Sequence, residues 1–80
     1  MKIMVEVFGP LTEYFDNKFQ FELKTGDNAD VLIKELVNNQ IMARELILAS
    51  AIAAGDQLID NDYEIKEHDI ISILPPPSGG

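Results

Sequence analysis

The residues best suited to chemistry in this chain lie at its C-terminal end, where positions 74–80 read LPPPSGG. The prolines lack backbone N–H donors and hold φ near the polyproline value, so they predict a stiff spacer that leaves the folded body. Residues 75–80 can extend about 20 Å, enough to enter the active-site tunnel of a partner protein. Gly79 and Gly80 carry no Cβ and fit where a larger residue would clash. The tail therefore predicts that Gly80 is presented to another protein.

The body of the chain offers little catalytic chemistry. It has one histidine, no cysteine, no glycine-rich phosphate loop and no metal-ligand spacing. His68 beside Asp69 occupies a predicted polar turn with no nucleophile nearby in sequence, so we assign it no catalytic role. The cluster at 60–62 with Glu64 lacks the spaced ligand series and the distal glutamate of an EF-hand loop, and turn chemistry accounts for it. We expect neither a metal site nor a catalytic group in the body.

A chain of 80 residues that ends in Leu-Pro-Pro-x-Ser-Gly-Gly resembles the small subunit of molybdopterin synthase, a family of ubiquitin-like sulfur carriers. The resemblance implies that an ATP-dependent activating enzyme adenylates Gly80, which is then converted to a thiocarboxylate. It further implies that the large synthase subunit receives the tail, within a heterotetramer, for sulfur transfer to a pterin precursor in molybdenum cofactor biosynthesis. By matching positions in the family, a partner-binding patch is expected at Phe8, Leu58 and Leu74.

Elementary chemistry agrees with this role for the tail. A carboxylate is a poor acyl donor, because its leaving group would be oxide, so ATP must first convert Gly80 to an acyl-adenylate. Sulfur delivered to that mixed anhydride leaves a thiocarboxylate, which is nucleophilic at sulfur. Since the sequence has no cysteine, a persulfide on this chain is excluded. The Gly79 amide and the Ser78 hydroxyl can bond to tunnel walls and position the tip.

This interpretation makes the chain a non-catalytic sulfur-donor subunit of a sulfurtransferase complex. Its partners would supply every base, metal and oxyanion group, no cofactor would be bound permanently, and ATP would be used by the activating enzyme. Three alternatives stay open. They are a thiamin-pathway sulfur carrier, whose members are typically shorter and lack the proline run, a ubiquitin-like modifier joined to lysines through Gly80, and an acidic interaction module with an inert tail.

The composition is that of one small acidic domain. With 46% hydrophobic residues and no cysteine, the chain depends on a single apolar core for its stability. The formal net charge of -8 argues against nucleic acid and suggests a basic partner surface, although an acidic excess also keeps small proteins soluble. No stretch approaches the about 18 apolar residues of a membrane span, and residues 1–3 do not open a signal peptide. We expect a cytoplasmic protein without membrane contact.

Alternating apolar residues predict two strands near the N-terminus. In residues 2–8 the β-branched side chains at odd positions share one face, and Phe8 lies on the other. Gly9-Pro10 ends this strand, and residues 11–15 predict one helical turn. Residues 18–24 alternate cleanly between apolar and polar side chains, which is typical of an edge strand with one face in water.

The second half predicts helices followed by three strands. Asp27 or Asn28 can cap a helix whose apolar stripe covers residues 31–37. Propensity alone favours one long helix over 41–54. The turn at 55–56, together with the family resemblance, favours instead a short helix followed by a strand, with a short returning strand at 57–59. The nearly continuous apolar run at 70–74 predicts a central strand covered on both faces.

This order of elements predicts an α+β fold that resembles the ubiquitin-like β-grasp, with a mixed sheet and one main helix packed on one of its faces. Residues 1–74 would form the domain, and 75–80 the extended Gly-Gly tail. The chain departs from the family in two turns. It has His68-Asp69 where the family usually shows Gly-Asp, and Ala54-Gly55 where the family often shows Val-Asn.

Overall fold

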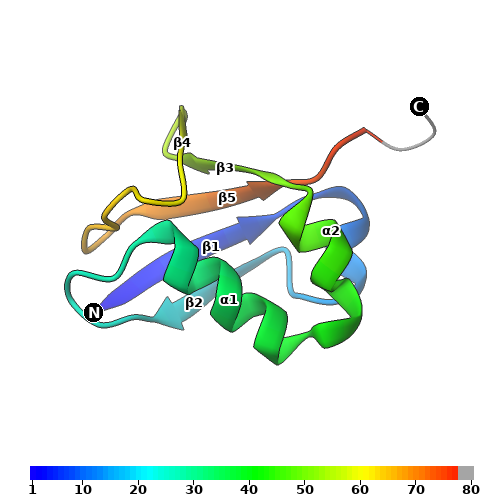
Figure 1. Ribbon diagram of the computed structural model, residues 1–80, viewed down its shortest axis with the longest axis horizontal. Helices are drawn as coiled ribbons and strands as arrows, with labels where there is room; N and C mark the ends of the chain where they lie inside the picture. The colour runs from blue at the N-terminus through cyan, green and yellow to red at the C-terminus, as the bar shows by residue number, and fades with distance from the viewer. Residues whose placement is uncertain (78–80) are drawn as a thin grey trace.

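A computed structural model describes residues 1–77, and Ser78, Gly79 and Gly80 lie outside the described residues. The helices and strands follow the predicted order (Figure 1). They are β1 (Lys2–Val7), the 3-10 helix η1 (Gly9–Glu13), β2 (Lys18–Glu22), α1 (Ala29–Asn39), the 3-10 helix η2 (Ile41–Ala43), α2 (Arg44–Leu48), β3 (Ala51–Ala54), β4 (Gln57–Ile59) and β5 (Ile70–Leu74).

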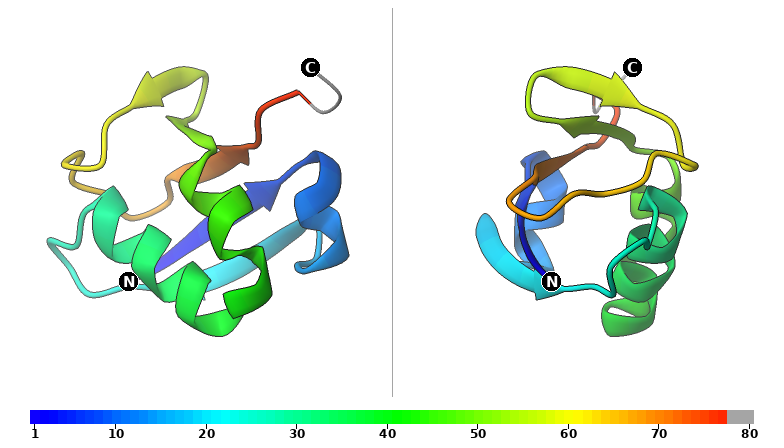
Figure 2. Two further views of the ribbon diagram at one scale, coloured as in Figure 1. Left: turned by 45° about the vertical axis from the view of Figure 1, so that its right-hand side comes forward. Right: turned by 90° about the vertical axis from the view of Figure 1, so that its left-hand side faces the viewer.

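The strands form one mixed sheet in the order β2-β1-β5-β3-β4. β1 and β5 run parallel, and the other neighbours are antiparallel. Both α-helices lie on the same face of the sheet (Figure 2). The predicted α+β architecture is therefore confirmed, with β2 at a sheet edge as its alternating pattern indicated. We call the face opposite α1 and α2 the open face.

The core lies between β1, β5 and α1. The odd positions of β1 are buried as predicted, and Val5 pairs with Phe19 of β2 on one side and with Ile71 of β5 on the other. α1 begins where the Asn28 side chain accepts a hydrogen bond from the Val31 N–H at 3.0 Å, which satisfies one of the unpaired donors of the first turn. The apolar stripe of α1 then belongs to the same core cluster as the strands.

The segment 41–54 folds as the short helix and strand that we favoured over one long helix. α2 ends at Leu48, and the Ser50 hydroxyl then donates to the Leu46 carbonyl at 2.7 Å. In β3, Ile52 pairs with Ile73 of β5 and is only 6% exposed. Pairing along β5 and burial of Ile52 thus outweigh the helix propensity of this alanine-rich segment.

The prediction that β5 is covered on both faces is wrong. The strand is central, but its residues alternate, with Ile71 and Ile73 fully buried and Ile70 41% exposed. The helices cover only one face, so Ile70, Ser72 and Leu74 point to the open face. A nearly continuous apolar run therefore indicates here an apolar patch on the open face rather than a second covering layer.

Backbone carbonyls of the loop after β4 cap the N-terminus of α1. The Ala29 and Asp30 N–H groups donate to the carbonyls of Tyr63 and Asn61 at 3.0 and 2.8 Å, and Ile65 is buried beneath the loop. Asp30 carries a lowered pKa, chiefly because Lys34 hydrogen-bonds its carboxylate at 2.9 Å. The acidic cluster at 60–62 is thus part of a helix-capping turn, in line with the turn chemistry predicted for it.

A second turn precedes β5. The Asp69 N–H donates to the Lys66 carbonyl at 3.1 Å, and the Asp69 carboxylate accepts from the Lys66 N–H at 2.8 Å and from the Tyr63 hydroxyl at 2.9 Å. The hydrogen bond to this carboxylate raises the pKa of Tyr63. His68 occupies the left-handed region of this turn, with φ of 72°.

We expect Ile71→Ala to lower the free energy of unfolding by about 3 kcal/mol, because it opens a cavity in the core. Ile70→Ala, at the neighbouring position of the same strand, should cost about 1 kcal/mol or less. Both changes lose the same strand propensity, so the difference between their urea midpoints at unchanged m-value reports burial alone. Equal losses would contradict the assignment of the open face.

We expect His68→Gly to raise the free energy of unfolding by about 0.5 to 1 kcal/mol, because glycine adopts positive φ without a steric penalty. His68→Ala is the matched control, since it removes the imidazole but keeps the Cβ, and it should bring no such gain. The same urea titrations measure both variants. A gain in the alanine variant equal to that in the glycine variant would assign the effect to the imidazole instead.

Candidate functional site

The tail leaves the domain from the middle of the sheet. At the end of β5, Ile73 pairs with Val7 of β1 and Leu74 pairs with Ala51 of β3, so the last strand is held on both sides. Residues 75–77 follow without regular secondary structure and run away from the sheet (Figure 1). Pro75 is half-buried, and the next two prolines are exposed. The predicted carrier residue Gly80 and the positioning residues Ser78 and Gly79 follow outside the described residues.

Gly9 lies against the root of the tail. Its φ is 57°, and a Cβ built on it would stand 3.5 Å from the Cγ of Pro75. β1 and β5 are parallel neighbours, so the segments that follow Val7 and Leu74 emerge at the same end of the sheet. We call the turn at Phe8 and Gly9 the corner. The corner is thus adjacent to the place where the tail starts.

The three predicted partner-binding residues, Phe8, Leu58 and Leu74, all lie on the open face. Each is next in sequence to a residue that packs in the core, and alternation along an extended chain turns it to the other side. Phe8 is extended, with φ of -135°, and 38% exposed, while Leu58 is 73% exposed and Leu74 is half-buried. We call these residues the open-face patch.

The sheet register shows how the members of the patch are spaced. Leu74 neighbours the β1 end that carries Phe8. Leu58 pairs with Ala53, which in turn pairs with Ser72 of β5. Small side chains therefore occupy the sheet positions between Leu58 and the other two members. Phe8 and Leu74 thus lie on neighbouring strands beside the root of the tail, and Leu58 lies on the same face of the sheet, with β3 between β4 and β5.

The open face also carries residues that the sequence analysis did not single out. Met4 pairs with Ile70, and Ile70 is 41% exposed, so they extend the apolar surface along β1 and β5. The alternation of β1 puts Met4 on the face opposite the core, so this pattern could have identified Met4 as part of the exposed apolar surface. The sequence pattern of Gly9 indicates only the end of a strand, because Gly9 and Pro75 are neighbours only in the folded chain.

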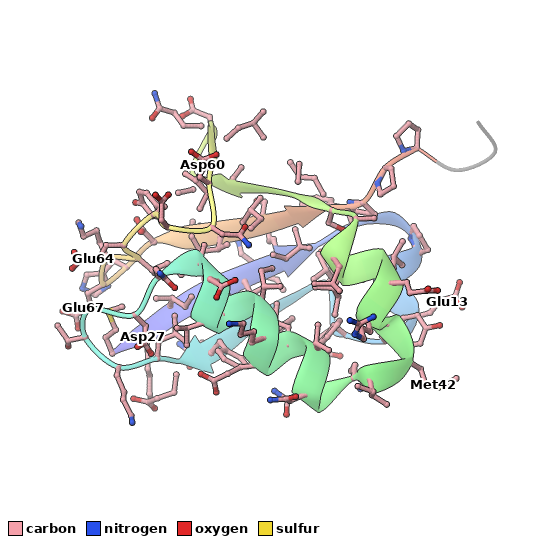
Figure 3. All side chains as sticks on the ribbon, in the orientation of Figure 1. Glu13, Asp27, Met42, Asp60, Glu64 and Glu67 are labelled. Atoms are coloured by element: carbon pink, nitrogen blue, oxygen red, sulfur yellow. The ribbon has the colours of Figure 1, made fainter. Side chains whose placement is uncertain are left out.

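Charge is spread over the body. On the open face, Glu6 faces Lys18 across the β1–β2 ladder, and Lys2 faces Glu22 in the same way. Glu13 lies toward the tail end of the molecule, whereas acidic residues at 27, 64 and 67 lie at the other end (Figure 3). The net charge of -8 therefore does not by itself mark the patch.

The part of the chain that the structure describes contains no group of three His, Asp or Glu side chains able to hold a metal ion. In residues 1–77, no helix has both the length and the apolar character needed to cross a bilayer.

Comparison with known proteins places these features in a family. The sequence matches the ThiS family over residues 5–80, while no curated protein sequence matches it. Among solved structures, it is similar to SAMP1 from Haloferax volcanii, with 12% identity, complete coverage of both chains at 100%, and a TM-score of 0.86. It is also similar to a putative molybdopterin converting factor subunit 1 from Pyrococcus furiosus, with 21% identity, coverage of 95% of this chain and 98% of that one, and a TM-score of 0.85.

A third similar structure is a complex of subunits 1 and 2 of the molybdopterin-converting factor from Helicobacter pylori 26695. The chain matched there is 30% identical, with 100% of both chains covered and a TM-score of 0.73. The mixed sheet, the order of its strands and the helices on one face are those of the ubiquitin-like β-grasp, as the sequence predicted. The chain belongs to the ThiS family.

Proposed function

We propose that this chain is the sulfur-carrier subunit of a molybdopterin synthase and that the Gly80 carboxyl group carries the sulfur. The observation that carries the proposal is the position of the open-face patch, because an exposed apolar surface lies directly beside the root of a Pro-Pro-Pro-Ser-Gly-Gly tail. A partner that covers the patch receives the tail at the same time. The similar Helicobacter pylori structure, a complex of two subunits, supports a large-subunit partner of this kind.

The chemistry of the tail is a cycle at one carbon atom. A Gly80 carboxylate oxygen attacks the α-phosphorus of ATP on an activating enzyme and releases pyrophosphate. Hydrosulfide from the sulfur donor then displaces AMP from the acyl carbon, which leaves a thiocarboxylate. On the large subunit, the thiocarboxylate sulfur attacks a carbon of the pterin precursor and displaces an oxygen substituent from that carbon. Water then cleaves the acyl carbon–sulfur bond, and Gly80 returns to a carboxylate while the sulfur stays on the substrate.

In this cycle the domain contributes binding and positioning and its partners contribute the catalytic groups. Docking of the patch makes delivery of the tail effectively intramolecular, which is the main advantage that a carrier protein offers. The chain itself therefore needs no bound cofactor, and ATP is consumed on the activating enzyme. A thiamin-pathway carrier and a ubiquitin-like modifier use the same first step and differ in the acceptor.

We expect incubation with ATP, an activating enzyme and a sulfur donor to replace one oxygen by one sulfur at Gly80. Intact mass followed by peptide mapping measures the change. A variant that lacks Gly79 and Gly80 should keep the urea midpoint of the full chain and gain no sulfur. An unchanged mass of the full chain, with an activating enzyme shown to be active on its own carrier, would sink the carrier proposal.

The molecule that receives the sulfur, or the Gly80 acyl group, distinguishes a molybdopterin synthase subunit from the two alternatives. The thiocarboxylated protein should transfer its sulfur to a pterin precursor in the presence of a molybdopterin synthase large subunit. Transfer only in the presence of a thiazole synthase would favour the thiamin pathway, and Gly80 found in isopeptide linkage to lysine would favour a protein modifier.

We expect Leu58→Ala to weaken binding to the large subunit about tenfold, because complete burial of a leucine side chain on docking contributes about 1.5 to 3 kcal/mol. Met42→Ala is the matched control. Met42 is 82% exposed but lies at the junction of α1 and α2, away from β4 (Figure 3). Titration calorimetry measures both affinities, and urea unfolding should show both variants as stable as the parent. A larger loss for Met42→Ala would place the interface on the helix side.

A further inference from the structure

We propose that Asn17 is a positioning residue that holds the corner at Phe8 and Gly9 against the root of the tail. The corner joins the open-face patch to Pro75, so its geometry sets where the tail leaves relative to the docking surface. The consequence for sulfur transfer rests on the proposed function, whereas the structural role of Asn17 does not.

Asn17 binds both backbone groups of Val7. The Val7 N–H donates to the Asn17 carbonyl at 2.9 Å, and the Asn17 side-chain Nδ2 donates to the Val7 carbonyl at 2.7 Å. In the regular β1–β2 ladder, Glu6 faces Lys18, so the next antiparallel pair would be Val7 and Asn17. The side-chain amide of Asn17 thus takes the part that a backbone N–H has in such a pair. It extends the ladder by one residue beyond the start of β2.

Other bonds fix the far side of the corner. The Leu11 N–H donates to the Phe8 carbonyl at 3.2 Å, and the Thr12 hydroxyl donates to the Gly9 carbonyl at 2.7 Å. Leu11 is 0% exposed, so η1 is held in the core. Phe8 and Gly9 are therefore held between two fixed points, the pair of Val7 with Asn17 before them and η1 after them.

The corner in turn supports the tail. Gly9 adopts the left-handed conformation that lets the chain turn after Phe8, and the side of its Cα on which a Cβ would stand faces the Pro75 ring, with 3.5 Å between that position and the ring Cγ. Because a proline ring is stiff, a neighbouring chain segment in this position narrows the directions in which the spacer can leave β5. The turn that carries Phe8 therefore flanks Pro75 at the root of the tail.

Only an amide at position 17 supplies this arrangement. Alanine lacks the donor and leaves the Val7 carbonyl without that partner. Aspartate has the shape of asparagine, but when ionised it places an oxygen acceptor against another oxygen acceptor. Loss of the bond should let the corner shift and the tail leave in a different direction, and displacement of a reacting group by about 1 Å can cost up to about a hundredfold in rate.

The test compares Asn17→Ala and Asn17→Asp with Tyr63→Phe. The control removes a part-buried side-chain hydrogen bond of similar length, from the Tyr63 hydroxyl to Asp69. That bond lies in the loop after β4, at the end of the molecule remote from the tail (Figure 1). All three variants should lose similar stability, so stability alone does not separate them.

The first measurement is structural and needs no partner. In NMR spectra of the full chain, both Asn17 variants should lose or weaken the nuclear Overhauser effects between Gly9 Hα and the Pro75 ring, and the Val7 amide should exchange faster with solvent. Tyr63→Phe should keep both signals. Intact Gly9–Pro75 effects in Asn17→Ala would overturn the proposal.

The second measurement is single-turnover sulfur transfer from the thiocarboxylated chain at saturating large subunit. Asn17→Ala should transfer about tenfold more slowly, and because the large subunit is saturating, a change in affinity through Phe8 does not limit this rate. Tyr63→Phe should transfer at the parent rate. An equal slowing in Tyr63→Phe, or an unchanged rate in Asn17→Ala, would overturn the positioning role. If the parent chain accepts no sulfur, the proposed function fails, and the NMR comparison still decides whether Asn17 positions the tail root.

Discussion

The fold depends on the parallel pairing of β1 with β5, the first and last strands of the chain. Parallel neighbours cannot be joined by a tight turn, so every element between them acts as a crossover that returns the chain to the start of β5. Val5, Val7, Ile71 and Ile73 from this pair are buried at 1% exposure or less, and they form the floor on which α1 packs. The same pairing brings the ends of β1 and β5 to one end of the sheet. The Phe8 corner and the tail are neighbours for this reason.

The two faces of the sheet have different tasks. The helices bury one face, and this face supplies the apolar contacts that an 80-residue chain without cysteine needs for stability. The open face keeps exposed apolar residues such as Phe8, Leu58 and Ile70. The grouping of these residues on one face fits the binding role that we propose for it. Substitutions on this face can therefore change binding with little effect on the fold.

The chemistry proposed for the chain takes place outside its folded domain. The reacting carboxyl group is on the tail, and the partners supply the groups that act on it. What the domain must provide is a fixed relation between the surface that docks and the strand from which the tail leaves. In our proposal Asn17 provides that relation through its hydrogen bonds to Val7, and Gly9 through its position beside the Pro75 ring. In this view the precision of the carrier is located at the root of the tail.

Local patterns in the sequence were sufficient for most of the fold and for the choice of candidate residues. Periodicity within one element shows which of its sides is buried, and it can be seen from residues close together in sequence. Examples are the alternation at 2–8 and 18–24 and the apolar stripe of α1. The cap at Asn28 is a local signal of the same kind for the start of a helix. The Gly-Gly tip and the missing cysteine likewise limit the chemistry without any structure. The choice of strand over helix at 51–54 needed the family resemblance as well, because the propensity of Ala51–Ala54 favours a helix.

Only the tertiary structure decided which surfaces are covered. The run at 70–74 predicts burial on both faces, yet within residues 1–77 no second layer covers the open face, and Ile70 and Leu74 are accessible there. Strand order and register join residues far apart in sequence. They set the spacing of Phe8, Leu58 and Leu74 and place Gly9 beside Pro75. Hydrophobicity reports that a residue prefers to leave water. Whether the domain itself or a partner covers it depends on how many layers the chain can build.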